Sequence, residues 1–246
     1  MDTPENSRSF DTELIKQHLE NARADIKALA KERHIKLLAV TKTVPVDIIN
    51  YAIDELGITA IGENRVQELL SKYESLHHPK NQKLEIHLIG SLQTNKVKYI
   101  IDKVDMIESV DSTKLAAEID RLAKKHGITM DILIEVNIGR EEQKGGILPE
   151  HLEAFIGDIN QFSNLRLRGL MTIAPKCENE NDYLKYFTET KELFDKISRI
   201  ICQEHFDTLS MGMSQSFRQA LIAGSTEVRL GSTLFGARIY HDQTQK

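Results

Sequence analysis

Lys42 is the residue whose type and position most clearly indicate chemistry. It follows Thr41 and the short apolar run Leu37–Val40, which is too short for a helix and has the branched residues of a buried strand. At the C-terminal end of a parallel strand, a lysine lies where α/β proteins bind ligands. A partly desolvated amine there can lose its proton and attack an aldehyde to form a Schiff base. The alternative is a surface lysine that brings the strand out to water.

Two segments rich in glycine and hydroxyl groups could bind an anion. Residues 210–214 read Ser-Met-Gly-Met-Ser, and residues 231–233 read Gly-Ser-Thr. Each follows a predicted strand and leads toward a helix start, where free backbone N–H groups and hydroxyls bind phosphate. The same pattern also fits ordinary turns with Ser214 as a helix cap, and both descriptions can hold together.

Arg229 lies between Val228 and Leu230 in the last predicted strand, which is too short to be exposed. A buried guanidinium needs a hydrogen-bond acceptor. One explanation is an ion pair across the barrel, for example with Glu63 or Glu135. The other is donation to the ring nitrogen or the phosphate of a ligand.

Three more residues near predicted strand ends each have an ordinary and a functional explanation. Asn64 could cap the following helix or bind a ligand oxygen. Met171 could fill the core or pack against an aromatic ring. His87 fits a core histidine better than an acid or a base.

These features together match one cofactor. A lysine able to form a Schiff base, two candidate phosphate loops and a polar group for a ring nitrogen are the parts of a pyridoxal 5′-phosphate (PLP) site. A phosphate-binding protein in which Lys42 supplies only charge would use the same residues. A visible absorbance band on the purified protein distinguishes the two.

The elements that must position these residues alternate along the chain. Hydrophobic patterning predicts an amphipathic helix from Asp11 to Arg33. Eight strands are predicted, one ending at Lys42 and the others over residues 58–62, 85–90, 104–109, 130–138, 165–173, 208–211 and 227–230. Helices are predicted over residues 48–56, 65–76, 93–101, from 111 or 112 to 126, from Pro149, over 182–203, and from Ser214 or Ser216 to Ala223.

This alternation predicts the fold. Repeated strand–helix units favour a parallel sheet, and eight of them in a chain of 246 residues favour a closed (β/α)8 TIM barrel of the α/β class. An open doubly wound sheet is the alternative, but no GxGxxG motif follows the first strand. We expect a single domain over residues 1–246, with residues 1–10 as a flexible tail. The extra N-terminal helix either covers the barrel bottom or replaces an outer helix, since none is predicted after the last strand.

Composition and charge argue against several other classes of function. The net charge of -5 offers no basic surface for nucleic acid. No apolar stretch approaches the roughly 18 residues of a membrane span, and the N-terminal segment resembles neither a signal nor a transit peptide. Cys177 and Cys202 lack metal-ligand spacing, so we expect reduced thiols, no metal site and a cytoplasmic location.

Six motifs of the chain resemble those of the pyridoxal phosphate homeostasis protein family. They lie at residues 38–45 (LAVTKTVP), 61–68 (IGENRVQE), 87–96 (HLIGSLQTNK), 167–171 (LRGLM), 209–214 (LSMGMS) and 228–238 (VRLGSTLFGAR). The resemblance covers nearly the whole chain, with the motifs in the expected order. The segment 139–146 also resembles the family's loop after the fifth strand, and we expect its Lys144 to face solvent.

The resemblance implies a barrel similar to the N-terminal domain of bacterial alanine racemase, with PLP held by Lys42 as a Schiff base. The candidate cofactor-binding residues are Lys42, Asn64, Met171, Ser210, Arg229, Gly231 and Ser232. Among them, the resemblance assigns the phosphate to Ser210, Gly231 and Ser232 and the pyridine nitrogen to Arg229. The other two are candidates for the neighbourhood of the cofactor.

The resemblance also implies a function. The family suggests a PLP-binding protein of intracellular vitamin B6 (PLP) homeostasis and amino-acid balance, without turnover or catalytic residues, whose clients are PLP-dependent apo-enzymes. The alternative is a PLP-dependent amino-acid racemase or another Schiff-base enzyme. Only residues 231–246 follow the last predicted strand, which disfavours the second domain that supplies the opposing tyrosine in racemases. We expect a monomer or weak dimer that binds neither nucleic acid nor membranes.

Overall fold

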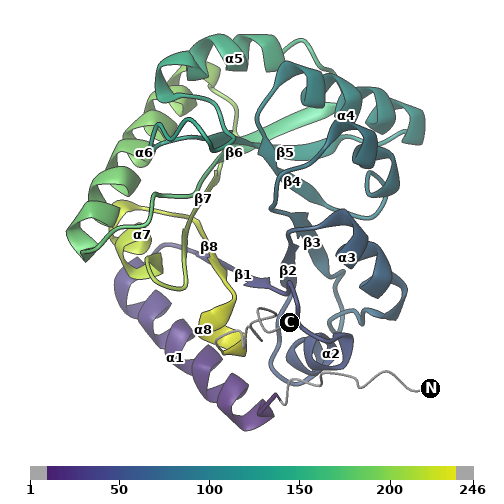
Figure 1. The fold of residues 1–246 in the computed structure, drawn as a ribbon, viewed down its shortest axis with the longest axis vertical. Helices are drawn as coiled ribbons and strands as arrows, with labels where there is room; N and C mark the ends of the chain where they lie inside the picture. The colour runs from purple at the N-terminus through teal and green to yellow at the C-terminus, as the bar shows by residue number, and fades with distance from the viewer. Residues whose placement is uncertain (1–9, 237–246) are drawn as a thin grey trace, which may run out of the picture.

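Eight parallel strands form a closed barrel in chain order (Figure 1). The structure is a computed structural model and describes residues 10–236. The strands are β1 (Lys36–Val40), β2 (Ala60–Glu63), β3 (Glu85–Leu88), β4 (Met106–Val110), β5 (Met130–Val136), β6 (Leu165–Thr172), β7 (Thr208–Met213) and β8 (Glu227–Leu230). The first and last strands pair directly, with Lys36 opposite Glu227 and Ala39 opposite Leu230. This closing pair confirms the predicted barrel and rules out the open sheet.

Helices surround the barrel as a ring (Figure 1). The α-helices are α1 (Thr12–Ala30), α2 (Val46–Asp54), α3 (Val66–Lys72), α4 (Thr113–His126), α5 (Leu152–Ile159), α6 (Glu180–Ile201), α7 (Phe217–Ala223) and α8 (Ser232–Phe235). Three 3₁₀ helices, η1 (Tyr73–Ser75), η2 (Thr94–Tyr99) and η3 (Pro149–His151), complete the connections. The predicted segment 93–101 is therefore a 3₁₀ helix.

The N-terminal helix α1 belongs to the outer ring. It lies beside α7 and α8 (Figure 1), where the His18 ring nitrogen is 3.2 Å from the Leu234 carbonyl oxygen and Arg218 pairs with Asp25. Of the two predicted positions, it takes the one that replaces an outer helix. The expectation that no helix follows the last strand is wrong, because the short α8 begins at Ser232.

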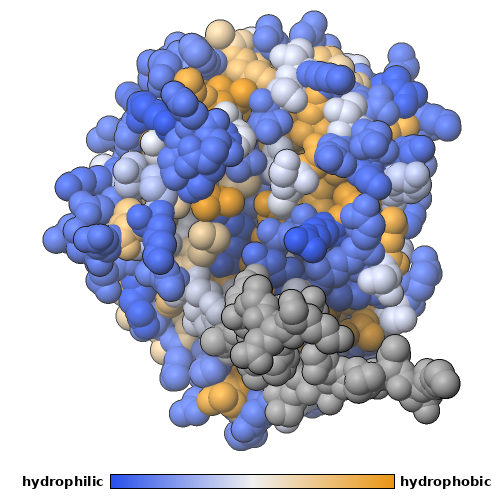
Figure 2. Space-filling model, viewed as in Figure 1, coloured by the Kyte–Doolittle hydropathy of each residue, from blue (hydrophilic) through white to orange (hydrophobic). Residues whose placement is uncertain are grey.

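The barrel has an apolar layer outside its strands and a mixed interior. Helices and outward-facing strand residues form the main core, while Leu38, Val40, Ala60 and Ile89 form a small separate cluster. Side chains of a strand alternate between its faces, so Leu38 and Val40 share the inner face of β1 and Lys42 continues their row. On the face seen in Figure 2, hydrophilic residues predominate over the helices, and hydrophobic residues gather around a hollow near the centre.

Two further sequence expectations concern the N-terminal tail and membrane-spanning helices. The predicted flexible tail, residues 1–10, falls outside the described residues except for Phe10. Within residues 10–236, none of the helices combines the length and apolar character that crossing a bilayer requires.

Candidate functional site

A cavity of about 370 Å³ opens at the C-terminal end of the barrel, within the range of about 300–1,000 Å³ that small-molecule sites occupy. Four of the seven predicted site residues line it: Lys42, Arg229, Gly231 and Ser232. They come from the ends of β1 and β8, which are neighbours in the barrel. The cavity therefore lies at the ends of β1 and β8, where the sequence analysis expects a ligand.

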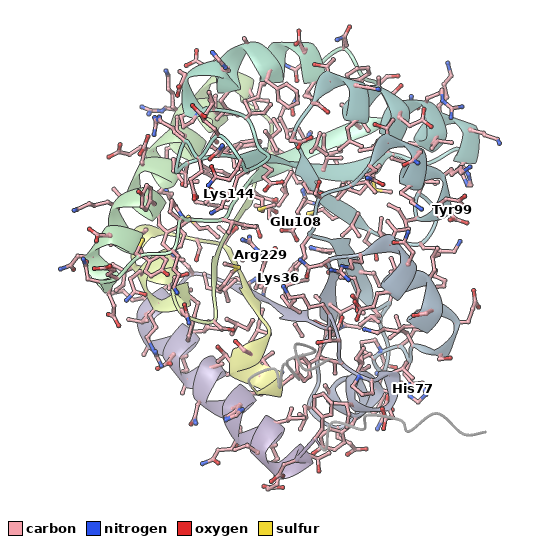
Figure 3. The ribbon with its side chains drawn as sticks, in the orientation of Figure 1. Lys36, His77, Tyr99, Glu108, Lys144 and Arg229 are labelled. Atoms are coloured by element: carbon pink, nitrogen blue, oxygen red, sulfur yellow. The ribbon has the colours of Figure 1, made fainter. Side chains whose placement is uncertain are left out.

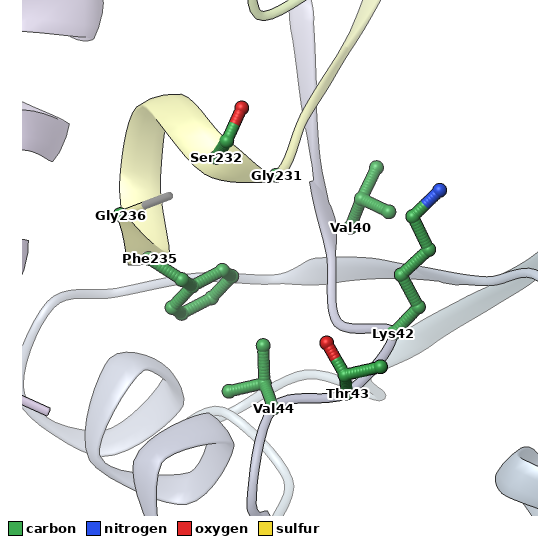
Figure 4. A pocket seen from close by; sticks show the side chains of 8 residues that line it. All are labelled: Val40, Lys42, Thr43, Val44, Gly231, Ser232, Phe235 and Gly236. Atoms are coloured by element: carbon green, nitrogen blue, oxygen red, sulfur yellow. The ribbon is translucent and has the colours of Figure 1, made fainter. Parts of the chain in front are cut away.

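Lys42 lies two residues beyond the end of β1 and is half-buried. Figure 4 shows its side chain running beside Val40, on the side of the turn formed by Gly231 and Ser232. A smaller space of about 20 Å³ is lined by these four residues together with Phe235 and others. The inward row of β1 thus delivers the lysine to the cavity, as the period of the strand requires.

The loop that carries Lys42 is fixed from α3. The Lys72 ammonium donates to the Thr41 backbone oxygen at 2.9 Å and to Glu68 at 2.7 Å. Glu68 in turn accepts the backbone N–H of Thr43, whose φ of 62° is uncommon for a residue other than glycine. The residues on both sides of Lys42 are therefore held by one charged pair.

Glu63, at the end of β2, completes this arrangement below the loop. Its carboxylate accepts the Thr41 hydroxyl at 2.7 Å and the Lys72 ammonium at 2.9 Å. Burial raises the pKa of Glu63, and the nearby Lys72 opposes that shift. The Lys72 ammonium therefore donates to two carboxylates and one backbone carbonyl, and these bonds together hold the loop after β1 in place.

The loops after β7 and β8 meet through Ser214. Its hydroxyl accepts the backbone N–H of Thr233 at 3.0 Å, and both Ser214 and Ser216 line the cavity. Within residues 10–236, the N–H groups of Gly231 and Ser232 donate no backbone hydrogen bond, so they are available to an anion. The predicted phosphate loops therefore lie side by side.

The expected helix cap does not form at this place. Ser216 precedes α7, but its hydroxyl accepts the Met213 N–H at 3.3 Å and no side-chain cap bond reaches the helix. The Ser214 hydroxyl instead accepts the backbone N–H of Thr233 in the loop after β8. The Ser214 hydroxyl thus joins the two loops, the Ser216 hydroxyl bonds back to the end of β7, and neither caps the helix.

Arg229 is only 3% exposed, and its accessible part faces the cavity. It donates through Nη1 to the Ser210 hydroxyl at 2.6 Å and through Nη2 to the Thr172 carbonyl at 2.7 Å. The expected ion pair across the barrel is present, but its carboxylate is Glu108 and not Glu63 or Glu135, with Oε2 4.0 Å from Nη1. Burial raises the pKa of Glu135 to about 7, Asp111 adds to that rise, and Arg229 opposes it.

Ser210 and Met171 do not line the cavity, and both are fully buried. β7 continues to Met213, beyond the predicted end at residue 211, so Ser210 lies inside the barrel and Ser214 takes the loop position. A buried hydroxyl in contact with Arg229 and two carboxylates is not accessible to a phosphate, which corrects the predicted role of Ser210. Met171 packs with Met106 and Leu133, in agreement with core filling.

Asn64 follows β2 and lies outside the cavity lining. It does not cap α3, whose N-cap residue is Arg65. Its backbone packs so tightly on Gly90 that a Cβ there would lie 2.3 Å from the Asn64 oxygen. Its side-chain Oδ1 is buried without a hydrogen-bond partner among the described residues, so a polar group supplied by water or a ligand would satisfy it.

His87 is a buried core histidine, as expected. Its Nδ1 lies 2.7 Å from Glu108 Oε1. Burial alone would lower the pKa of His87, but Glu227, Glu108 and Glu85 together raise it to about 10. His87 therefore carries a positive charge inside the barrel at neutral pH.

Sequence reasoning did not identify several residues of the site. Lys144, Lys176 and Tyr183 line the cavity from the loops after β5 and β6 and from α6; Lys144 is also exposed, as expected. Glu108 and Glu227 are buried inside the barrel. The signal for Glu227 was present, because it lies two residues before Arg229 and must share its face of β8.

Comparison with known proteins gives consistent results. Residues 16–239 match the family model described as alanine racemase, N-terminal domain. A pyridoxal phosphate homeostasis protein of Aquifex aeolicus is 46% identical over 211 residues, 85% of this chain and 90% of that protein. The one of Haemophilus influenzae is 35% identical over 233 residues, 95% of this chain and 97% of that protein.

Solved structures agree with this result. PipY of Synechococcus elongatus with PLP bound has a TM-score of 0.79 and 31% identity, over 90% of this chain and 100% of that one. An alanine racemase of Clostridium difficile has a TM-score of 0.71 at 18% identity, over 95% of this chain and 59% of that one. The likeness to the racemase shows the fold alone.

Proposed function

The chain belongs to the pyridoxal phosphate homeostasis protein family, and we propose that it binds PLP through Lys42 and takes part in intracellular PLP homeostasis and amino-acid balance. One observation carries the proposal. Lys42, Arg229, Gly231 and Ser232 line a single cavity of about 370 Å³. An amine, a guanidinium and an anion-binding turn are the groups that an aldehyde, a pyridine nitrogen and a phosphate require.

The residues of the cavity fit the parts of PLP. PLP supplies an aldehyde that forms a Schiff base with a primary amine. The backbone N–H groups of Gly231 and Ser232, with the hydroxyls of Ser214 and Ser216, would hold the phosphate. Hydrogen bonds use two of the five N–H donors of Arg229 within the described residues, which leaves donors for the ring nitrogen.

The proposal covers release as well as binding. The cavity is open to solvent, which suits loading of the cofactor and its delivery to PLP-dependent apo-enzymes as clients. Cys177 and Cys202 are free thiols, which supports action in the reducing cytoplasm. A monomer or weak dimer without sustained turnover of its own completes the proposal.

A spectrum and a covalent trap test this function. Adding PLP to the apo-protein should produce a visible absorbance band that borohydride bleaches, and peptide mass spectrometry should place the reduced adduct on Lys42. Lys42→Ala should lose the band, whereas Lys144→Ala, which removes another cavity lysine, should keep it. An adduct found only on Lys144 or Lys96 would contradict the assignment.

A further inference from the structure

The interior of the barrel contains a cluster of polar side chains directly below the cavity. It consists of His87, Glu108, Ser210, Glu227 and Arg229, all at most 3% exposed. They come from the inner faces of β3, β4, β7 and β8. Figure 3 shows Glu108 and Arg229 close to each other near the middle of the barrel. Groups of this kind are costly to bury unless each is hydrogen-bonded, so their arrangement needs a reason.

The hydroxyl of Ser210 is the centre of the cluster. Its Oγ lies 2.6 Å from Arg229 Nη1, 2.7 Å from Glu108 Oε2 and 2.8 Å from Glu227 Oε1. A hydroxyl has one proton to donate and two lone pairs to accept with, and a guanidinium can only donate. Ser210 therefore accepts from Arg229 and donates to one carboxylate. The other carboxyl group can hydrogen-bond to it only by donating a proton of its own.

The surroundings of the two carboxyl groups favour a proton on Glu227 over one on Glu108. Although burial opposes it, the hydrogen bond from His87 lowers the pKa of Glu108. Burial and the neighbouring Glu108 raise the pKa of Glu227 to about 7. Of the two carboxyl groups, Glu227 therefore holds a proton more readily and donates it to Ser210, while Glu108 accepts from His87 and Ser210. Every hydrogen bond at the serine then has one donor and one acceptor.

An acceptor outside the cluster holds the guanidinium from a second direction. Arg229 also donates to the Thr172 carbonyl on β6, so acceptors on two strands fix the plane of the group. We propose that Ser210 and Glu108 are positioning residues, which hold Arg229 where its remaining donors meet the pyridine nitrogen of the cofactor. The proposal rests on the proposed function, since it requires that PLP occupies the cavity.

An analogue without the ring nitrogen isolates this interaction. We would measure the dissociation constants of PLP and of 1-deazapyridoxal 5′-phosphate, in which a C–H replaces the nitrogen. The wild-type protein should prefer PLP by about tenfold or more, because a hydrogen bond to a charged group has that worth. Ser210→Ala and Glu108→Gln should each reduce the preference by about threefold or more, because the Arg229 guanidinium would then be held less firmly against the ring nitrogen. A merely structural role would weaken both ligands equally and leave the ratio unchanged.

Ser225→Ala is the matched control. Ser225 is fully buried, and its hydroxyl has no hydrogen-bond partner among the described residues. This variant loses a buried serine hydroxyl without contact to Arg229, so it should keep the wild-type ratio. An unchanged ratio in folded Ser210→Ala or Glu108→Gln would overturn the positioning role while leaving the proposed function intact. If the wild-type protein bound neither ligand, the proposed function itself would fail.

A measurement on the wild-type protein covers the case in which neither variant folds. With ¹⁵N-labelled arginine, the Nη–H groups of Arg229 should give separate NMR signals that exchange slowly with water, because Ser210 and Thr172 hold them. A single averaged, rapidly exchanging signal would overturn the proposal.

Discussion

The Lys72 ammonium lies 2.9 Å from the backbone oxygen of Thr41, the residue directly before Lys42. It also reaches Glu63 at 2.9 Å and Glu68 at 2.7 Å, and its side chain is only 12% exposed. A lysine on α3 therefore determines where the loop after β1 lies. Lys42 itself is held indirectly, through the backbone of its neighbours.

Replacing Lys72 by methionine should weaken both the fold and PLP binding. Removing one member of a buried ion pair typically costs about 3–5 kcal/mol of unfolding free energy. A loosened loop must also be ordered on binding at roughly 1–2 kcal/mol per residue, so the affinity for PLP should fall by about tenfold. Chemical denaturation and a PLP titration measure the two effects. Lys185→Met, which removes an exposed pair with Asp182, should change neither; unchanged PLP affinity in Lys72→Met would contradict the role of the loop.

The phosphate of the cofactor should supply much of its affinity. Charge-assisted hydrogen bonds contribute about 1.5–3 kcal/mol each, so pyridoxal, which lacks the phosphate, should bind orders of magnitude more weakly than PLP. Ser214→Ala, which removes a hydroxyl proposed to hold the phosphate, should reduce this discrimination, and Ser210→Ala should not, because Ser210 lies outside the cavity. Titration of each variant with both vitamers gives the result. Equal affinities of wild-type protein for PLP and pyridoxal would show that the loops do not bind phosphate.

His87 should make stability depend on alkaline pH. Its pKa in the folded protein is raised from 6.5 to about 10, so the folded state holds a proton that the unfolded state releases. This contribution to the free energy of unfolding is complete below about pH 6.5 and is lost as the pH rises through about 10. Ring ¹⁵N NMR should show doubly protonated His87 at about pH 8, above the ordinary histidine value. A neutral ring at that pH would refute the charge assignment.

The sequence predicts the barrel and the position of Lys42 well, and physical reasons explain both. Strand–helix alternation has few solutions at this length, and the ends of parallel strands must meet at one face. Ser210 was misplaced because strand ends are hard to locate in Gly-, Ser- and Met-rich segments, and β7 extends two residues beyond the predicted end at residue 211. With the longer strand, Ser210 lies three residues before the end of β7 and not one, so it points into the barrel below the cavity.

The interior cluster could not be derived from sequence in the same way. Strands of a parallel barrel are buried on both faces, so the sequence does not distinguish an inward from an outward residue. Glu108 lies between Ile107 and Ser109, and nothing local shows that it meets Arg229 from across the barrel. Pairing of residues 121 positions apart depends on closure of the barrel, which only the structure shows.

The cavity offers limited support for carbanion chemistry, the basis of the racemase alternative. Racemisation needs an acid and a base on opposite faces of the substrate Cα. Tyr183 lines the cavity, but its hydroxyl accepts the backbone N–H of Cys177 at 3.2 Å and is tied to the loop after β6. Lys144 is paired with Glu141. If Arg229 meets the pyridine nitrogen as proposed, its fixed positive charge would also disfavour protonation of that nitrogen and weaken the electron sink.

We therefore expect the PLP-loaded protein to exchange the Cα proton of L-amino acids slowly and to form no sustained D-isomer. The test is incubation with L-alanine and other L-amino acids in deuterium oxide, followed by NMR for exchange and chiral chromatography for the products. Lys42→Ala serves as the background, and Tyr183→Phe tests the hydroxyl group best placed as a second acid or base. Sustained turnover that both substitutions abolish would establish an enzyme, because it would show that the cavity supplies groups on two faces of the substrate. Slow exchange of the Cα proton that Tyr183→Phe leaves unchanged would instead indicate that Lys42 is the only acid or base at the substrate. That result is consistent with a carrier.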